Sequence, residues 1–159
     1  RQPAGEKLCL ADYFQPIGGR PDLVAFQAVT VGIQAEPLYE RLEREGEYSR
    51  GLYIRGLASS TAEALAEVVN QRVRADLGIA AERGRRYSWG YGACPDLSQQ
   101  RAILRILGAE RIGLKLTEGD QLDPEHSTVA LVIHHPEAKY FAVHQPGQGS
   151  PLNEMAAAL

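Results

Sequence analysis

Residues 85–95 bring together the side chains of this chain that are best suited to bind a small molecule. They read Arg-Arg-Tyr-Ser-Trp-Gly-Tyr-Gly-Ala-Cys-Pro and include the only tryptophan in the sequence. An arginine side chain offers a planar fork that matches a carboxylate or a phosphate, and glycines let the backbone turn tightly and approach a ligand closely. The stretch therefore indicates a site for a small anionic ligand with a flat ring, although aromatic-rich turns that close the edge of a core have a similar composition.

The order of residues in this stretch resembles a known signature. In the reactivation domain of cobalamin-dependent methionine synthase, which binds S-adenosylmethionine, an arginine and three variable residues precede Gly-Tyr, usually followed by Pro-Ala-Cys-Pro. Arg86, Gly90 and Tyr91 match this signature, and Gly92 stands where the first proline is usual. Three further stretches match motifs of this family in the same order; they are residues 9–14, 116–118 and 134–141. The resemblance therefore runs from about residue 7 to about residue 145.

The resemblance implies which residues hold S-adenosylmethionine. Arg86 matches the arginine that binds the ligand's carboxylate, and Asp12 matches the aspartate that meets its ammonium group. Ser88 occupies a position that contacts the adenine through its backbone, so the identity of its side chain should matter little. Tyr91 matches a tyrosine that borders the ligand and faces the corrin ring when the domain docks.

An aromatic pair and one glutamate complete the implied site. Tyr140 and Phe141 match a pair beside the ligand, and we favour Tyr140 because neighbours in a strand point to opposite faces. Glu63 matches a glutamate near the ligand groove. From the sequence alone, Glu63 and Glu67 lie four residues apart on one helix face, a spacing that is more typical of a solvated acidic stripe, so only the resemblance singles out Glu63.

The other polar residues of the implied site also have ordinary structural explanations. Arg86 could pair with Glu82 at the surface, Asp12 could cap a turn, and Tyr91 could be a half-buried core residue. His134 and His135 do not indicate a metal site, because neighbours in a strand cannot easily chelate one ion together. No Ser-His-Asp set or nucleophile elbow appears in the sequence.

The composition excludes several classes of function. The 159 residues are enough for one domain with a substantial core, and a net charge of −3 gives no reason to expect a surface that binds nucleic acid. The sequence contains no apolar run of membrane-spanning length and no signal segment. We therefore expect a cytoplasmic protein, with Cys9 and Cys94 as reduced, buried thiols and no metal ion.

The ends of the chain differ from its middle. Residues 1–6 resemble the remnant of a linker, residues 7–146 form the expected domain, and residues 147–159 form a glycine- and alanine-rich tail. The chain opens on Arg1 and its only methionine is Met155, so we expect a piece of a longer polypeptide.

The hydrophobic pattern predicts two helices after an early strand. Residues 23–31 are apolar on nearly both faces, which is typical of a central strand. Pro37 suits the first turn of a helix that ends near Glu45. A longer helix is predicted from residue 48 to 77, with its apolar residues recurring at three- and four-residue steps; they include Leu52, Leu57, Leu65 and Val68.

The second half of the domain is predicted to contain more strands. A capping box of Asp96 and Gln99 should begin a helix that ends at Gly108. Short strands are expected at residues 114–117 and 127–134, with 140–143 as the hairpin partner of the latter. This clustering of strands favours an α+β fold with an antiparallel sheet, and the resemblance implies a single C-shaped domain with a twisted sheet and flanking helices.

The resemblance also implies a function. The whole enzyme is a methyltransferase that makes methionine from homocysteine, and its cobalamin is occasionally oxidised to an inactive form. The reactivation domain presents the methyl group of S-adenosylmethionine for reductive methylation of that cobalamin, which a separate domain of the same polypeptide holds. Flavodoxin or a flavoprotein reductase supplies the electron, so the domain alone should bind the methyl donor without turnover.

Two other functions stay open from the sequence. The chain could be a binding protein of the same fold that serves another corrinoid enzyme. Alternatively, it could be a non-catalytic interaction module whose arginine and aromatic loop docks a protein partner.

Overall fold

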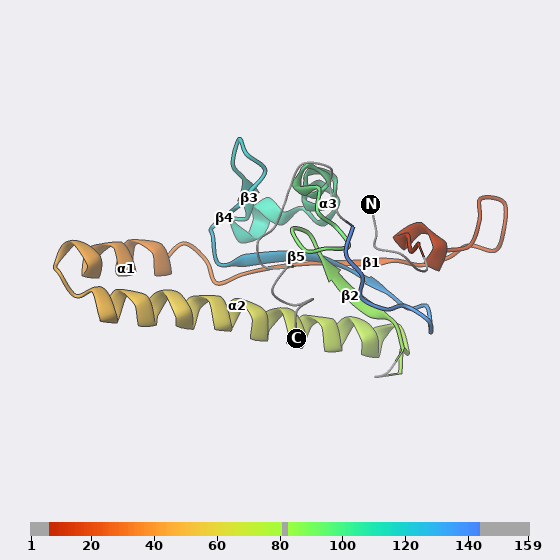
Figure 1. Ribbon diagram of the computed structural model, residues 1–159, viewed down its shortest axis with the longest axis horizontal. Helices are drawn as coiled ribbons and strands as arrows, with labels where there is room; N and C mark the ends of the chain where they lie inside the picture. The colour runs from red at the N-terminus through yellow and green to blue at the C-terminus, as the bar shows by residue number, and fades with distance from the viewer. Residues whose placement is uncertain (1–6, 81–82, 144–159) are drawn as a thin grey trace, which may run out of the picture.

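The computed structural model describes residues 7–80 and 83–143 of the chain, which form helices around a small sheet (Figure 1). In chain order the elements are η1 (Leu10–Tyr13), β1 (Ala25–Thr30), α1 (Ala35–Arg44), α2 (Tyr48–Asp76), β2 (Arg85–Ser88), η2 (Leu97–Gln99), α3 (Gln100–Leu107), η3 (Ala109–Ile112), β3 (Lys115–Leu116), β4 (Leu122–Asp123) and β5 (Ser127–Ile133), where η denotes a 3-10 helix.

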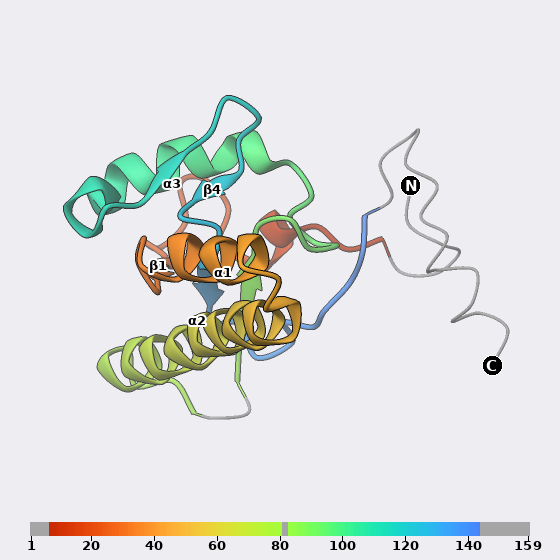
Figure 2. The same ribbon diagram turned by 90° about the vertical axis from the view of Figure 1, so that its left-hand side faces the viewer.

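The main sheet has three antiparallel strands in the order β1-β5-β2. Strand β5 lies at its centre and is buried along almost its whole length, while β3 and β4 form a separate two-stranded ribbon. Helix α2 packs on one face of the main sheet and α3 on the other (Figures 1 and 2). The α+β class and the antiparallel sheet predicted from the sequence are therefore confirmed.

Helix α2 contacts the sheet through small side chains. Gly51 is buried against α1, and the other buried residues of α2 recur at helical steps; they are Ala58, Ala62, Ala66 and Asn70. Small residues let the helix backbone come close to the strands, and the Gln27 side-chain amide of β1 donates a hydrogen bond of 3.0 Å to the Ala66 carbonyl oxygen. The apolar residues Leu52 and Leu57, whose spacing predicted the helix, are instead about two-thirds exposed. The helix is confirmed, but these leucines do not form its buried face.

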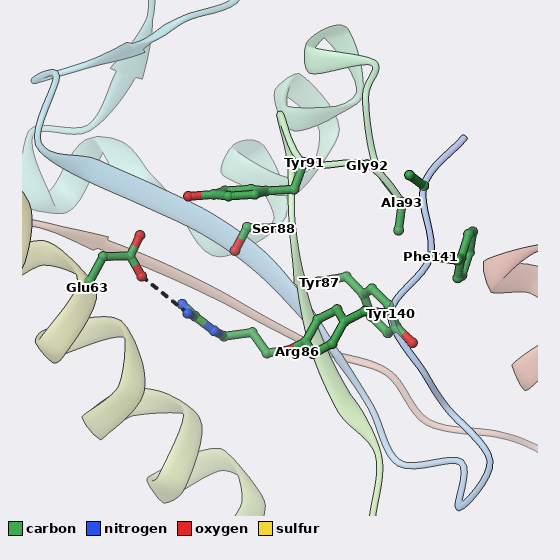
Figure 3. Close-up of a pocket in the computed structure, with 10 residues that line it drawn as sticks. Glu63, Arg86, Tyr87, Ser88, Tyr91, Gly92, Ala93, Tyr140 and Phe141 are labelled. Atoms are coloured by element: carbon green, nitrogen blue, oxygen red, sulfur yellow. Dashed lines mark hydrogen bonds and ion pairs between the residues drawn. The ribbon is translucent and has the colours of Figure 1, made fainter. Parts of the chain in front are cut away.

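The opposite face of the sheet carries most of the large apolar side chains. Two clusters form there, one around Tyr87, Leu131 and Ile133 and the other around Val129 and the buried face of α3. Because side chains alternate along a strand, the position of Tyr87 on this face turns its neighbours Arg86 and Ser88 toward α2. Figure 3 shows Arg86 directed at that helix.

Two predictions for strands were wrong in a related way. Residues 140–143 form no strand, because both edges of β5 are already occupied by β1 and β2. Strand β1 is covered on both faces but lies at an edge of the sheet, so its continuous apolar pattern reflects the two helix layers and not a central place. The strand predicted at 114–117 is confirmed as β3, although its partner β4 was not foreseen.

Two smaller expectations were met only in part. Asp96 caps the turn before α3, since its carboxylate accepts a hydrogen bond from the Ser98 amide at 3.0 Å, but Gln99 instead accepts one from the Trp89 ring nitrogen at 3.2 Å. Cys94 is buried, and burial raises the pKa of its thiol to about 11, whereas Cys9 is exposed. Within residues 7–80 and 83–143, no helix is both long and apolar enough to cross a membrane.

Candidate functional site

A pocket of about 510 Å³ opens between α2 and the end of β2 (Figure 3). This volume lies within the range usual for small-molecule sites, roughly 300–1,000 Å³. Its lining residues come from α2, from β2 and the turn that follows it, and from the segment after β5; they are Glu63, Arg86, Tyr87, Ser88, Tyr91, Gly92, Ala93, Tyr140, Phe141 and Ala142. Six of the residues expected from the sequence are among them: Glu63, Arg86, Ser88, Tyr91, Tyr140 and Phe141.

Arg86 is the strongest candidate for holding an anion in this pocket. Its side chain is only 19% exposed, and its Nη2 atom lies 3.3 Å from the Glu63 Oε2 atom. Its Nη1 atom is buried and has no hydrogen-bond partner among the described residues. A buried donor left unpaired costs about 1–3 kcal/mol, so the pocket favours a ligand that brings an acceptor to this atom. Glu82, the other partner considered for Arg86, lies outside the described residues.

The backbone of β2 offers further hydrogen bonds beside Arg86. The Trp89 amide donates to the Val129 carbonyl oxygen at 3.3 Å, which makes this a hydrogen-bonded pair of the ladder with β5. Hydrogen-bonded and non-hydrogen-bonded pairs alternate in an antiparallel ladder, so Arg86 and Ser88 are the residues whose N–H and C=O groups point to the free edge. A flat ring with donors and acceptors on its rim can pair with such an edge.

Exposed aromatic side chains flank the pocket. Tyr91 and Tyr140 are 63% and 69% exposed, so Tyr91 is not the core residue that the sequence left as an alternative. The Tyr140 ring lies against Tyr87, with a centroid distance of 5.6 Å and an interplanar angle of 63°. The centroid of the Phe141 ring lies 6.3 Å from that of Tyr87. Exposed large apolar groups gathered at a hollow are typical of a ligand site.

Asp12 is not among the residues that line the pocket. It belongs to η1, and its Oδ2 atom accepts a hydrogen bond of 3.1 Å from the Cys9 amide. This is the turn-capping contact that the sequence offered as its alternative explanation. The carboxylate that the described structure brings into the pocket is that of Glu63.

Four lining residues were not expected from the sequence: Tyr87, Gly92, Ala93 and Ala142. Three of them belong to the signature stretch, so their places close to Arg86 and Tyr91 could have suggested them. Tyr87 donates a hydrogen bond of 2.8 Å to the Lys139 carbonyl oxygen, and burial of its ring is the main reason that the pKa of its hydroxyl is raised. Nothing in the sequence identified Ala142 as a lining residue, because an alanine outside a regular helix or strand belongs to no recognisable sequence pattern.

The adjacent histidines have separate structural contacts. His134 Nε2 lies 2.7 Å from Asp22 Oδ1, and this hydrogen bond, with two from backbone amides, lowers the pKa of Asp22 to about 2. The His135 ring lies 5.5 Å from that of Tyr13. In the described part of the chain, no three His, Cys, Asp or Glu side chains gather closely enough to hold a metal ion.

Comparison with known proteins gives a consistent result. The family model described as "Vitamin B12 dependent methionine synthase, activation domain" matches residues 1–150. The methionine synthases of Mycobacterium tuberculosis and Mycobacterium leprae are 38% and 35% identical over 167 aligned positions, which cover 90% of this chain. The chain spans only 14% of the length of these curated relatives.

A solved structure agrees with the fold. The crystal structure of the MetH reactivation domain bound to AdoHcy superposes with a TM-score of 0.79 at 30% sequence identity. The match covers 86% of this chain and 47% of that chain.

Proposed function

Because this chain belongs to the vitamin B12 dependent methionine synthase activation domain family, we propose that it binds S-adenosylmethionine and presents the methyl group for reductive methylation of cobalamin. The observation that carries the proposal is the position of Arg86. This residue lines a pocket of suitable size, and its buried Nη1 atom has no hydrogen-bond partner among the described residues. The solved relative with AdoHcy, the demethylated form of this ligand, supports it.

The pocket matches the charged end of S-adenosylmethionine. Arg86 would hold the ligand's carboxylate by charge-assisted hydrogen bonds. The ammonium group needs a carboxylate, and Glu63 supplies one at the pocket beside Arg86. Asp12, which the family resemblance assigns to the ammonium group, is the second candidate. Its carboxylate would have to accept a hydrogen bond from the ligand as well as the one from the Cys9 amide.

The other end of the ligand matches the edge of β2. The adenine rim would pair with the N–H and C=O groups that Ser88 directs away from β5, which makes the Ser88 hydroxyl dispensable. Tyr140, Phe141 and Tyr91 would border the ligand. Tyr91 is exposed at the rim of the pocket, where a docked domain could reach it.

The chain's own residues bind and orient the methyl donor, and the remaining chemistry belongs to other parts of the enzyme. Cobalamin on its own domain of the same polypeptide would supply the cobalt that accepts the methyl group, and flavodoxin or a flavoprotein reductase would supply the electron. The whole enzyme would be a cytoplasmic methionine synthase that transfers methyl groups from methyltetrahydrofolate to homocysteine. The isolated domain would bind without turnover.

Calorimetric titration of S-adenosylmethionine into the unmodified chain and into Arg86→Ala tests the proposal. Loss of a charge-assisted hydrogen bond costs roughly 1.5–3 kcal/mol, so the affinity of Arg86→Ala should fall about ten- to a hundredfold. Arg72→Ala is the matched control, because Arg72 pairs with Asp76 on the outer side of α2 and is 79% exposed; its affinity should not change. Absence of binding by the unmodified chain would overturn the proposal and favour an interaction module.

A further inference from the structure

The segment of residues 139–143, here called the strap, forms one wall of the pocket although it belongs to no strand (Figure 3). Tyr140, Phe141 and Ala142 all line the pocket from this segment. Without a sheet ladder to hold it, the strap needs other contacts to keep these side chains in place. The position of the wall therefore depends on a few specific interactions.

The strap is held near both ends by hydrogen bonds to the backbone. At its start, the Tyr87 hydroxyl donates to the Lys139 carbonyl oxygen at 2.8 Å, and the Lys139 amide donates to the Tyr13 hydroxyl at 3.4 Å. At its end, the Val143 amide donates to the Gly92 carbonyl oxygen at 2.7 Å. The turn that carries Tyr91 is thus bonded directly to the strap that carries Tyr140.

Gly92 permits this close approach because it has no side chain. A Cβ atom at position 92 would lie 2.7 Å from the Ala142 Cβ atom and 2.9 Å from its Cα atom, which is closer than nonbonded carbon atoms come. The φ angle of Gly92 lies outside the left-handed region, so its backbone conformation is open to other residues. The close contact with the strap, and not the backbone conformation, is therefore what requires glycine at position 92.

We propose that Gly92 is a positioning residue that sets the width of the pocket by letting the strap lie against the turn. A larger residue would push the strap outward and separate the aromatic side chains of the strap from Tyr91. This inference rests on the proposed function, because the pocket is taken to bind S-adenosylmethionine. It gives a structural reason for the glycine at position 92, where the usual signature has a proline.

Gly92→Ala tests this role, with Gly56→Ala as the matched control, because a Cβ atom at Gly56 would meet nothing within 4 Å. Calorimetry should show about tenfold weaker binding of S-adenosylmethionine by Gly92→Ala and no change for Gly56→Ala. Amide hydrogen exchange measured by NMR in the absence of ligand should be at least about tenfold faster at Val143 in Gly92→Ala. The melting temperature should fall by no more than about 3 °C, since the strap lies outside the sheet.

The double variant Gly92→Ala/Ala142→Gly removes one of the two clashing Cβ atoms and should recover part of the affinity. Tyr87→Phe loosens the strap at its other end by removing one hydroxyl, and it should also weaken binding. If Gly92→Ala does not fold, Tyr87→Phe is the deciding variant. Unchanged affinity of Tyr87→Phe for S-adenosylmethionine would then overturn the positioning role of Gly92.

Two results for Gly92→Ala would overturn the positioning role while the proposed function stands. One is unchanged affinity, and the other is weaker binding with unchanged exchange at Val143, since the effect would then not act through the strap. Absence of binding by the unmodified chain would overturn the proposed function and the positioning role together, and that outcome is recognised before any variant is compared.

Discussion

Arg86 shows how much of the candidate site a single residue carries. One guanidinium nitrogen is committed to Glu63, while another is buried without a partner among the described residues. The signature order in the sequence identified Arg86 directly. Its contact with Glu63 could not be read from the pattern, because the two residues lie 23 positions apart and meet only when α2 packs across the sheet.

Asp22 provides a residue-scale prediction about acid stability. The His134 hydrogen bond is the largest cause that lowers its pKa from 3.8 to about 2, so the folded chain favours the charged carboxylate. The stabilisation is fully present above about pH 4 and is lost as the pH falls through about 2. Thermal unfolding of Asp22→Asn followed from pH 5 to 2 should therefore show a smaller loss of stability than the unmodified chain shows.

His134→Gln serves as the partner control for this prediction. It leaves the carboxylate but removes the main cause of the lowered pKa, so it should reduce the acid dependence in the same pH window. Identical pH profiles for the unmodified chain and both variants would mean that the Asp22–His134 contact does not stabilise the fold in solution.

At the scale of elements, α2 shows that the sequence pattern located a helix correctly without identifying its buried face. Its length was confirmed almost to the residue, since propensity and spacing are local properties. Its buried face depends on how closely the sheet approaches, and that distance favours Ala58, Ala62 and Ala66 over the larger Leu52 and Leu57. The hydrophobic pattern alone cannot separate these two stripes.

The predicted strand at residues 140–143 failed for a similar reason. Its aromatic and β-branched residues suit a strand, but pairing also requires a free edge on the partner. Strand β5 has none, because β1 and β2 occupy both sides. Which edges remain free is decided by the whole sheet.

Gly84 gives a prediction about the entry to β2. Its φ of +73° is in the left-handed region, and a Cβ atom there would collide with the Ile133 carbonyl oxygen of β5. Gly78 has a similar φ of +63° but open space around it. Urea unfolding should show a loss of about 1–2 kcal/mol for Gly78→Ala, from the backbone conformation alone, and a clearly larger loss for Gly84→Ala.

The comparison of these two glycines isolates the steric contact from the backbone strain. Equal losses of unfolding free energy would mean that β2 and β5 separate easily at this end. Gly84→Ala should also weaken ligand binding, because Arg86 follows two residues later and moves with the strand.

At the scale of the whole molecule, the pocket joins segments that are far apart in the sequence. Its walls come from α2, from β2 with its turn, and from the strap. The family resemblance and the α+β class were available from the sequence because four short motifs occur in one order. The arrangement of the walls was not, since it depends on the packing of α2 and the strap against one strand edge.

Ligand binding should therefore stabilise the whole domain. At a concentration of S-adenosylmethionine about a hundred times its Kd, mass action adds about 2.7 kcal/mol. For a domain of this size that amounts to a rise of roughly 5–11 °C in melting temperature, measurable by differential scanning fluorimetry. Arg86→Ala at the same ligand concentration should show a much smaller rise, whereas Arg72→Ala should behave as the unmodified chain does. No rise in the unmodified chain would contradict binding to the folded state.

Because the two cysteines differ in burial, their alkylation can report whether the domain has unfolded. Cys9 is exposed, while Cys94 lies in the core beside Tyr87 with the pKa of its thiol raised to about 11. Alkylating reagents attack the thiolate form, so the folded chain offers them Cys9, and Cys94 becomes reactive only when the core around the signature turn comes apart. The number of labels on each molecule then distinguishes chains that have stayed folded from chains that have opened.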